Sequence, residues 1–161
     1  GLPEMVADPP LFQIPPTRNL IVESVRFVRE GVFDQKKLGG ALLATYGRRT
    51  VRDGLEVAAE LALFAGENRS GADSLYSALR EYLTAEIPAR PVLALGEDAF
   101  TLRHKRHGLT LVMRQGAYVA MVYQVRDTLA AEAMLREIAK RIRAQEPLAP
   151  VKSDSEDVGD R

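Results

Sequence analysis

The sequence has 161 residues, of which 46% are hydrophobic and 27% charged, values typical of one globular domain and unlike those of a disordered chain. Its 22 basic and 22 acidic residues cancel, so the charge gives no support to a nucleic-acid binder, whose affinity comes from neutralising phosphates. The lack of cysteine excludes disulfides, thiol nucleophiles and thiolate metal sites, and no apolar run approaches the roughly 20 residues of a membrane-spanning helix.

The two ends of the chain differ in composition from its middle. Five of the nine prolines lie in residues 1–18, which we expect to form a tether or a surface strap, because proline fixes φ and donates no backbone hydrogen bond. Residues 147–161 are polar and acidic, which predicts a flexible tail. Residues 19–146 remain as a single domain. The start at Gly1 rather than Met indicates a processed or engineered end, so we expect any signal peptide or anchor to have been removed.

The first part of the domain is predicted to hold a strand and a helix. Alternating apolar residues from Leu20 to Phe27 favour a strand. Asp34 is a suitable cap for the start of a helix, and Gly47 is a suitable residue to end it. The apolar face of this helix would be formed by Leu38, Leu42 and Tyr46.

A hairpin is predicted next, around Asp53-Gly54. Asp-Gly is favoured where both central residues of a turn need positive φ. From Leu55 to Leu63 every second residue is apolar, while Glu56 and Glu60 lie at alternate positions. This alternation predicts a strand with one buried face.

A helix and three strands follow. Apolar residues recur every three or four positions over 70–83, which predicts a helix with one apolar face. Strands are expected over 100–103, 109–114 and 118–125, and the last is apolar on both sides, as a central strand would be. Tight turns should join them at His107-Gly108 and Gln115-Gly116.

The last predicted element is a helix that begins at Asp127 or Thr128. Two acidic residues stand four positions before arginines on its surface, in the pairs Glu132–Arg136 and Glu137–Arg141. The complete order is β-α-β-β-α-β-β-β-α. It predicts an α+β fold with a mainly antiparallel sheet and packed amphipathic helices.

From about Val22 to Ala144, the chain resembles a group of uncharacterised bacterial exported domains, often lipoproteins, with a PsbP-like α/β/α sandwich. The resemblance rests on glycine and apolar positions, which are Leu38-Gly39-Gly40, Tyr46-Gly47, the helix with Ala72, Leu75 and Tyr76, the segment Leu95 to Phe100, and the segment Leu111 to Val119. It implies a location in the cell envelope or periplasm and a role as an accessory subunit or ligand sensor. A cytoplasmic location is the alternative. The resemblance implies no catalytic residue.

The candidate binding residues form one basic run that contains both histidines: Arg103, His104, Lys105, Arg106 and His107. A basic hairpin tip that ends in glycine can approach phosphate or an acidic partner surface closely. Metal binding is not predicted, because a spacing of three on a strand or turn does not reliably bring two imidazoles together, and no carboxylate or cysteine stands near. A solvated tip, kept soluble by its charge, is the interpretation that the sequence favours.

Four tyrosines form a second candidate group. Tyr118 and Tyr123 belong to the predicted central strand, and Tyr76 and Tyr82 belong to the helix over 70–83. They could line a pocket, although packing in or around the core is the commoner role of tyrosines in such positions.

No set of residues predicts catalysis. Glu56 and Glu60 would lie roughly 13 Å apart along a strand, beyond the roughly 5–9.5 Å of paired catalytic carboxylates. Gly39-Gly40 lacks the Lys-Ser/Thr of a phosphate-binding loop. We therefore predict no catalytic residue, no metal and no cofactor.

These observations favour a non-enzymatic binding or accessory domain that docks on a membrane-associated protein complex or senses a ligand. Its partners would be proteins, without nucleic acid and without a transmembrane segment in this chain. Two alternatives remain. One is a small hydrolase that uses His104 or His107, and it requires a cleft with a perturbed histidine beside a nucleophile or acid. The other is a polyanion-binding module built from the basic run and from Lys140 and Arg143 of the last helix.

Overall fold

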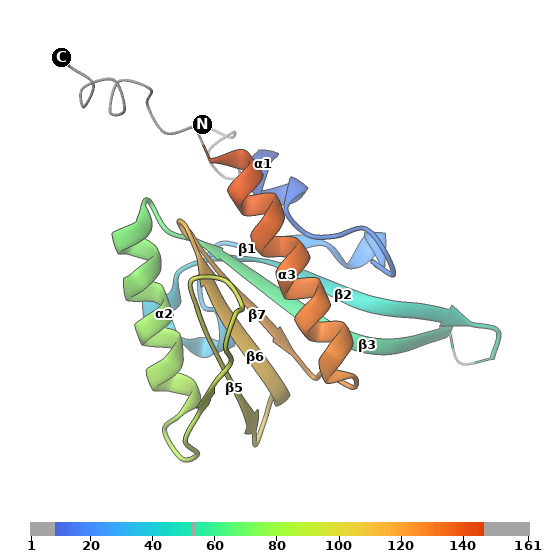
Figure 1. Cartoon of the computed structure of the whole chain (residues 1–161). Coiled ribbons are helices and arrows are strands. Elements are labelled where there is room, and N and C mark those ends of the chain that lie inside the picture. The colour runs from blue at the N-terminus through green and yellow to red at the C-terminus, as the bar shows by residue number, and fades with distance from the viewer. Residues whose placement is uncertain (1–8, 53, 147–161) are drawn as a thin grey trace.

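Seven strands form one antiparallel sheet, and a helix covers each of its faces, so the domain has three layers (Figure 1). The structure, a computed structural model, describes residues 9–52 and 54–146. The predicted α+β class with a mainly antiparallel sheet is confirmed. In sheet order, the strands are β1 (Arg26–Val28), β2 (Ala41–Thr50), β3 (Gly54–Ala65), β7 (Tyr118–Tyr123), β6 (Gly108–Gln115), β5 (Asp98–His104) and β4 (Arg90–Pro91). The helices are α1 (Pro9–Gln13), α2 (Arg69–Leu83) and α3 (Thr128–Gln145), with single 3-10 turns η2 (Val22–Ser24), η3 (Val32–Asp34) and η4 (Lys36–Leu38).

The core lies on both sides of β7, the central strand. β7 pairs with β3 on one edge and β6 on the other. Its side chains alternate between the two faces: Val119 and Met121 pack on the side of α2, and Ala120 and Val122 pack on the side of α3. The predicted central position of this strand is therefore confirmed.

Both long helices begin at the caps that their sequences favour. The Asn68 side chain accepts a hydrogen bond from the Gly71 N–H at the start of α2. The Asp127 side chain accepts bonds from the first amides of α3, as predicted. The two predicted ion pairs of α3 are also present, Glu132–Arg136 at 3.4 Å and Glu137–Arg141 at 3.0 Å.

The prediction of a helix between Asp34 and Gly47 is wrong. This segment forms η3, η4 and then β2, which pairs with β1 and β3. Leu42 and Tyr46 stand four positions apart, a spacing that fits a helical face and equally one face of a strand. Pairing with strands on both edges decides between the two. The first predicted strand is also shorter, since its early residues form η2 and Leu20 makes only an isolated bridge to Tyr46.

β2 and β3 form the predicted hairpin, with Thr50 paired to Gly54, and its distal half projects beyond the rest of the sheet (Figure 1). β7 pairs only with Glu60–Ala65 of β3, so among the described residues no strand pairs with the distal part of β3 on that edge, where the Arg126 N–H donates to the Ala58 carbonyl at 3.2 Å. The register shifts at Tyr46/Gly47, where β3 carries one extra residue. The strand predicted to have one buried face is buried on both faces from Leu61 to Phe64, because α2 covers the second face.

The described part of the predicted N-terminal strap packs along α3. Leu11 and Ile14 are buried in the core on that side. Arg141 of α3 donates to the carbonyl oxygens of Gln13 and Pro15 at 3.2 and 3.3 Å. Residues 9–13 form one short helix rather than an extended segment, because proline is tolerated in the first turn of a helix. The predicted acidic tail, 147–161, lies outside the described residues. In the described part of the chain, no helix is long and apolar enough to cross a membrane.

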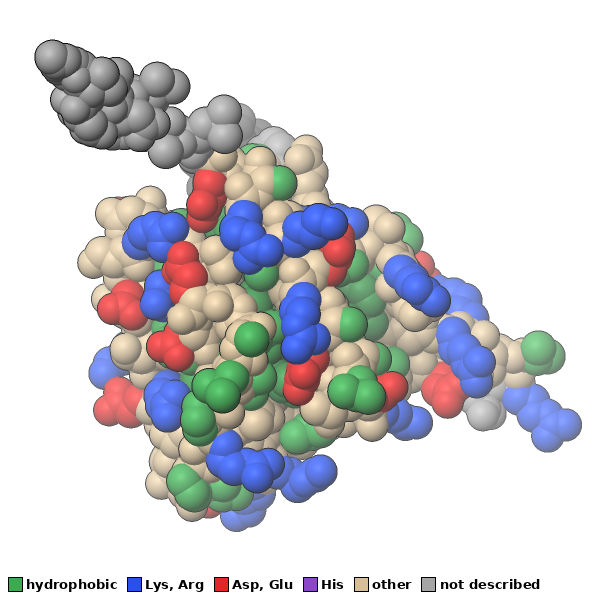
Figure 2. Space-filling model, viewed as in Figure 1, with side chains coloured by type: hydrophobic (Ala, Val, Ile, Leu, Met, Phe, Trp, Pro, Cys, Tyr) green, Lys and Arg blue, Asp and Glu red, His purple; other side chains and the backbone are tan. Residues whose placement is uncertain are grey.

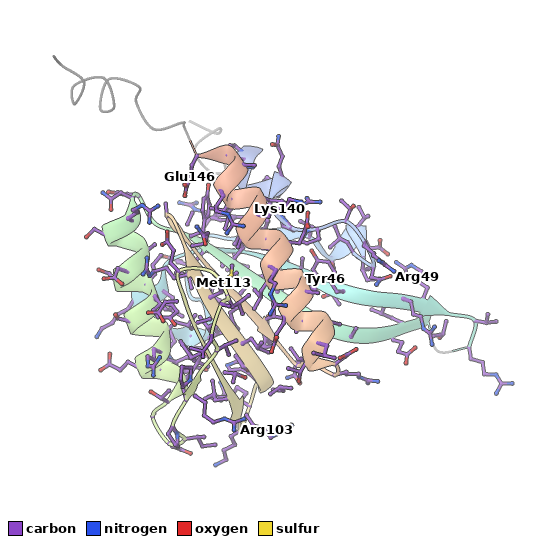
Figure 3. The ribbon with its side chains drawn as sticks, viewed as in Figure 1. Tyr46, Arg49, Arg103, Met113, Lys140 and Glu146 are labelled. Atoms are coloured by element: carbon purple, nitrogen blue, oxygen red, sulfur yellow. The ribbon has the colours of Figure 1, made fainter. Side chains whose placement is uncertain are left out.

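Glu97 connects α2 with β6 and with the turn after β6 at one end of the sheet. Its carboxylate accepts hydrogen bonds from Arg69 of α2 at 2.6 Å, from Arg114 of β6 at 2.9 Å and from the backbone N–H of Gly116 at 3.2 Å. Arg69 also lies 3.8 Å from Glu146, at the end of α3 (Figure 3). Burial acts to raise the pKa of Glu97, but the hydrogen bonds from Arg69 and Gly116 outweigh it and hold this pKa below its ordinary value of 4.5.

Replacing Glu97 with glutamine is expected to lower the free energy of unfolding at pH 7 by about 2 kcal/mol, because three donors lose a charged acceptor. The folded-state pKa is depressed, so this contribution is present above the unfolded-state pKa and is lost as the pH falls through the folded-state pKa. Urea unfolding of wild type and Glu97→Gln should therefore show a smaller difference at pH 3 than at pH 7. An equal difference at both pH values would contradict the role of the charge.

Candidate functional site

Three segments that are distant in sequence enclose a cleft of about 660 Å³ at one end of α2. They are residues 33–35 around the end of η3, the C-terminal end of α2 with residues 85–87 after it, and the turn between β5 and β6 at residues 104–106. In Figure 1 the segment between β1 and β2 lies beside α2, which is where the first two of these segments meet. A volume of this size is within the range of small-molecule sites, about 300–1,000 Å³.

Five rings pack together at the base of this cleft and form what we call the ring cluster: Phe33, Tyr82, His104, His107 and Tyr123. The Phe33 ring centroid lies 4.6 Å from that of His107 and 5.4 Å from that of Tyr123. The two imidazoles are stacked at 4.7 Å. Four parts of the chain, which are η3, α2, the β5–β6 hairpin and β7, thus contribute rings to this cluster. Phe33, Tyr82 and His104 also line the cleft.

His107 is the buried member of the ring cluster. Its side chain is only 6% exposed, and its Nε2 lies 2.8 Å from the Tyr82 hydroxyl oxygen. Burial, together with nearby His104 and Arg106, lowers the pKa of His107 to about 4, so the ring is neutral at pH 7. The interpretation of the basic run as a solvated tip is therefore wrong for this residue. The hairpin turn folds back onto α2, which the local sequence does not indicate.

His104 presents a single hydrogen-bond donor. Its Nδ1 accepts hydrogen bonds from the backbone N–H groups of Arg106 at 3.0 Å and His107 at 3.1 Å. Since Nδ1 accepts, the proton of the neutral ring is on Nε2. Burial, with Arg106 close by, lowers the pKa of His104 and favours this neutral form. No described residue bonds to Nε2.

Lys105 and Arg106 are exposed at the mouth of the cleft. Neither forms an ion pair with a carboxylate of the described residues. The turn that carries them is held by Gln124, whose side-chain amide donates to the Arg106 carbonyl at 3.2 Å and whose backbone N–H donates to the His107 carbonyl at 2.8 Å. The backbone from which these two cations extend is therefore held in place, while their side chains are exposed.

Arg103 does not join the other members of the basic run. Leu102 packs on the side of α2, and neighbouring residues of a strand point to opposite faces. Arg103 therefore lies on the side of α3, as Figure 3 shows, and it does not line the cleft. The structure brings His104, Lys105 and Arg106 together at the cleft, with His107 behind them.

Phe33 is the residue of this site that sequence analysis missed. Its backbone has φ +56° and ψ +25°, in the left-handed region that bulky residues rarely adopt. Asp34 also has a positive φ of +59°. Such positions cost about 1–3 kcal/mol and persist only where surrounding contacts hold them. Here the surrounding contacts are those of the Phe33 ring with His107 and Tyr123.

Backbone strain at Phe33 predicts that its glycine variant is more stable than its alanine variant, which is the reverse of the usual order. Both Phe33→Ala and Phe33→Gly remove the ring, but only glycine adopts positive φ without steric cost. Phe33→Gly should therefore unfold at higher urea concentration and be more stable by about 1 kcal/mol, whereas alanine is the better residue in ordinary helices and strands. Greater stability of Phe33→Ala would rule out a strained backbone at this position.

The fold separates the four candidate tyrosines, and Tyr118 packs against the core on the side of α3. Tyr82 and Tyr123 belong to the ring cluster, and Tyr82 lines the cleft. Tyr76 is buried in the core beside Phe100, so packing is its role, as the sequence favoured.

The geometry of the histidines gives little support to the hydrolase alternative. Tyr82 and His107 do place a hydroxyl beside a histidine with a perturbed pKa. A ring with a pKa of about 4 is a weak base at neutral pH, and an effective general base has a pKa near the working pH. His107 also does not line the cleft, and His104 uses its basic nitrogen to accept two backbone N–H groups.

The basic residues that a polyanion-binding module would need do not form one patch. Lys140 lies toward the far end of α3 from Arg103 (Figure 3). On the face that carries α3, Lys and Arg side chains alternate with Asp and Glu (Figure 2). A polyanion binder instead needs basic groups gathered in a patch or stripe.

A second groove, of about 550 Å³, lies between the strap, the start of the projecting hairpin and α3. It is lined mainly by small and apolar side chains, among them Pro16, Ala59, Ala131 and Met134. The Tyr46 hydroxyl, at its edge, already donates to the Pro16 carbonyl at 2.7 Å. Two of the charged side chains at this groove, Glu137 and Arg141, pair with each other at 3.0 Å.

In comparisons with known proteins, no family model, no curated protein and no solved structure matches this chain. The resemblance to exported PsbP-like domains therefore stays a prediction. The cleft has to be interpreted from its own geometry.

Proposed function

We propose that this domain binds a small ligand in the cleft between residues 33–35, the end of α2 and the β5–β6 turn, and that it acts as a binding or accessory domain rather than as an enzyme. The observation that carries the proposal is the left-handed backbone of Phe33, a residue whose ring belongs to the ring cluster and also lines the cleft. Strained positions of this kind occur most often at ligand and active sites.

Three further features support a binding role. The cleft has a volume suited to a small molecule, and its base is an aromatic surface. His104, Lys105 and Arg106 supply donors that no described acceptor uses. Gln124 fixes the backbone of the turn that carries these donors, so the backbone does not have to be ordered when a ligand binds.

The proposal includes a location in the cell envelope, on a membrane-associated complex. What supports this part is the resemblance described above, together with the projecting half of the β2–β3 hairpin. Figure 2 shows Lys and Arg side chains along this projection and a hydrophobic side chain at its tip. Val51, at the tip, is fully exposed. Docking on a protein partner through this tip is therefore the second candidate function.

The binding role is tested by ¹H–¹⁵N NMR spectra of the full chain during addition of a library of small aromatic and aliphatic fragments. We expect the fragments that bind to shift the signals of residues 33–35, 82–87 and 104–106. Phe33→Ala should lose these shifts, and Phe12→Ala, an exposed aromatic residue on α1, should keep them. Fragments that bind only at the groove beside α3, or nowhere, would refute the proposal.

Docking through the hairpin tip is tested separately by a photo-reactive amino acid placed at residue 51 in living cells. The matched control is residue 129 of α3, which is 77% exposed. The proposal expects one discrete crosslinked protein from position 51 and none from position 129. Identical products at both positions would indicate nonspecific contact.

A further inference from the structure

We infer that the ligand of the cleft is a planar aromatic compound with a single carboxylate group. This inference rests on the proposed function and specifies the chemistry of its ligand. It follows from two parts of the same site: the ring surfaces of Phe33, Tyr82 and His104, and the three donors of the β5–β6 turn.

The ring surfaces favour an aromatic body. Phe33 and Tyr82 are stacked, with 11° between their planes and centroids 6.3 Å apart, and Tyr82 lies 5.8 Å from His104. Aromatic pairs prefer centroids about 4.5–7 Å apart and gain about 0.5–1.5 kcal/mol beyond the burial of their area. A planar ring that enters the cleft can add to this stack, whereas an aliphatic chain gains only from burial.

The turn supplies the polar end of the site. The Nε2–H of His104 is a donor because Nδ1 accepts two backbone N–H groups, and Lys105 and Arg106 contribute two positive charges. All three groups are donors, so they suit an anionic acceptor such as a carboxylate. A cationic ligand would find no acceptor among these three side chains.

The remaining charged residues limit the ligand to one negative charge. Asp34 and Glu86 also line the cleft, and Glu86 is close enough to His104 to affect its pKa. Two carboxylates balance the two cations, and the imidazole of His104 is neutral. A dianion such as a phosphate monoester would meet repulsion from Asp34 and Glu86, while a monoanion can lie against the turn with less of this cost.

Four ring compounds test the inference against the wild-type full chain at neutral pH and low salt: benzoate, benzyl alcohol, benzylamine and phenyl phosphate. Dissociation constants come from NMR titration of the cleft signals. Benzoate should bind about tenfold more tightly than each of the others, because charge-assisted hydrogen bonds contribute about 1.5–3 kcal/mol. Its affinity should also fall as salt is added.

The double variant Lys105→Ala/Arg106→Ala should weaken benzoate binding about tenfold and leave benzyl alcohol binding unchanged. Arg103→Ala is the matched control, because this arginine belongs to the same basic run but lies on the other face of the sheet, and it should bind benzoate as wild type does.

Tighter binding of benzyl alcohol, benzylamine or phenyl phosphate at the cleft would overturn the inferred ligand and leave the binding role intact. Failure of all four compounds to shift the cleft signals at millimolar concentration would overturn the inferred ligand. The fragment library would then show whether the cleft binds ligands of another class. A loss of benzoate affinity in Arg103→Ala about half as large in free energy as that of the double variant, which removes twice the charge, would show that only the overall charge matters, and this also contradicts the inference.

Discussion

Acidification from pH 7 to pH 4 should lower the free energy of unfolding by about 3 kcal/mol through His107 alone. The pKa of this ring is about 4 in the folded chain and about 6.5 in the unfolded chain. Between these values the unfolded state binds a proton that the folded state does not, and stability therefore falls as the pH falls. The groups around the ring are His104, Arg106, Tyr82 and Tyr123, none of which supplies a negative charge at these pH values.

The measurement is urea unfolding of wild type and His107→Leu at several pH values between 7 and 4. Other groups titrate in this range, so the informative quantity is the difference between the two proteins. His107→Leu should be less stable at pH 7, because Tyr82 loses its partner, and should gain about 3 kcal/mol relative to wild type by pH 4. A difference that does not change with pH would show that His107 is accessible and easily protonated.

Leu135→Ala should lower the free energy of unfolding by about 3 kcal/mol and the melting temperature by roughly 10 °C. Leu135 is fully buried between α3 and the sheet, so its truncation removes apolar contacts and leaves a cavity. Leu129 lies on the same helix but is 77% exposed, and Leu129→Ala should change stability by less than about 0.5 kcal/mol. Calorimetry of the two variants and wild type measures the changes in melting temperature.

Similar losses from Leu129→Ala and Leu135→Ala would mean that α3 does not pack on the sheet through the face described here. This helix also holds the strap, through Arg141, and lies near Glu97, through Glu146. A large loss at Leu135 alone would therefore support the three-layer arrangement on which the position of the cleft depends.

β5 and β6 contribute to the core and also carry the turn that lines the cleft. β6 is buried along most of its length and β5 at Ala99, Phe100 and Leu102, and the turn that connects them meets the end of α2. The donors of the proposed site thus lie on a short turn anchored by a rigid sheet. The backbone of such a turn keeps its geometry without a ligand, which removes the backbone part of the entropic cost of binding.

Several elements could be predicted from the sequence because local chemistry specifies them. α2 and α3 follow from apolar residues three and four positions apart, and α3 follows also from the cap at Asp127. The hairpin that ends at Gly54 and the central position of β7 follow from turn chemistry and from apolar residues on both faces. The basic run that the sequence singled out contributes to the cleft, since three of its five residues line it and His107 lies behind them.

Tertiary contacts alone decided the rest. A spacing of four fits a helix and a strand equally, so β2 became a strand only because β1 and β3 pair with it. The left-handed backbone of Phe33 is unfavourable by itself, and rings from α2, β7 and the β5–β6 turn hold it in place. The same packing buries His107 and sets its pKa. Local sequence specifies conformations that are stable over a few neighbouring residues, whereas a strained residue and a buried histidine are stable only once distant segments surround them.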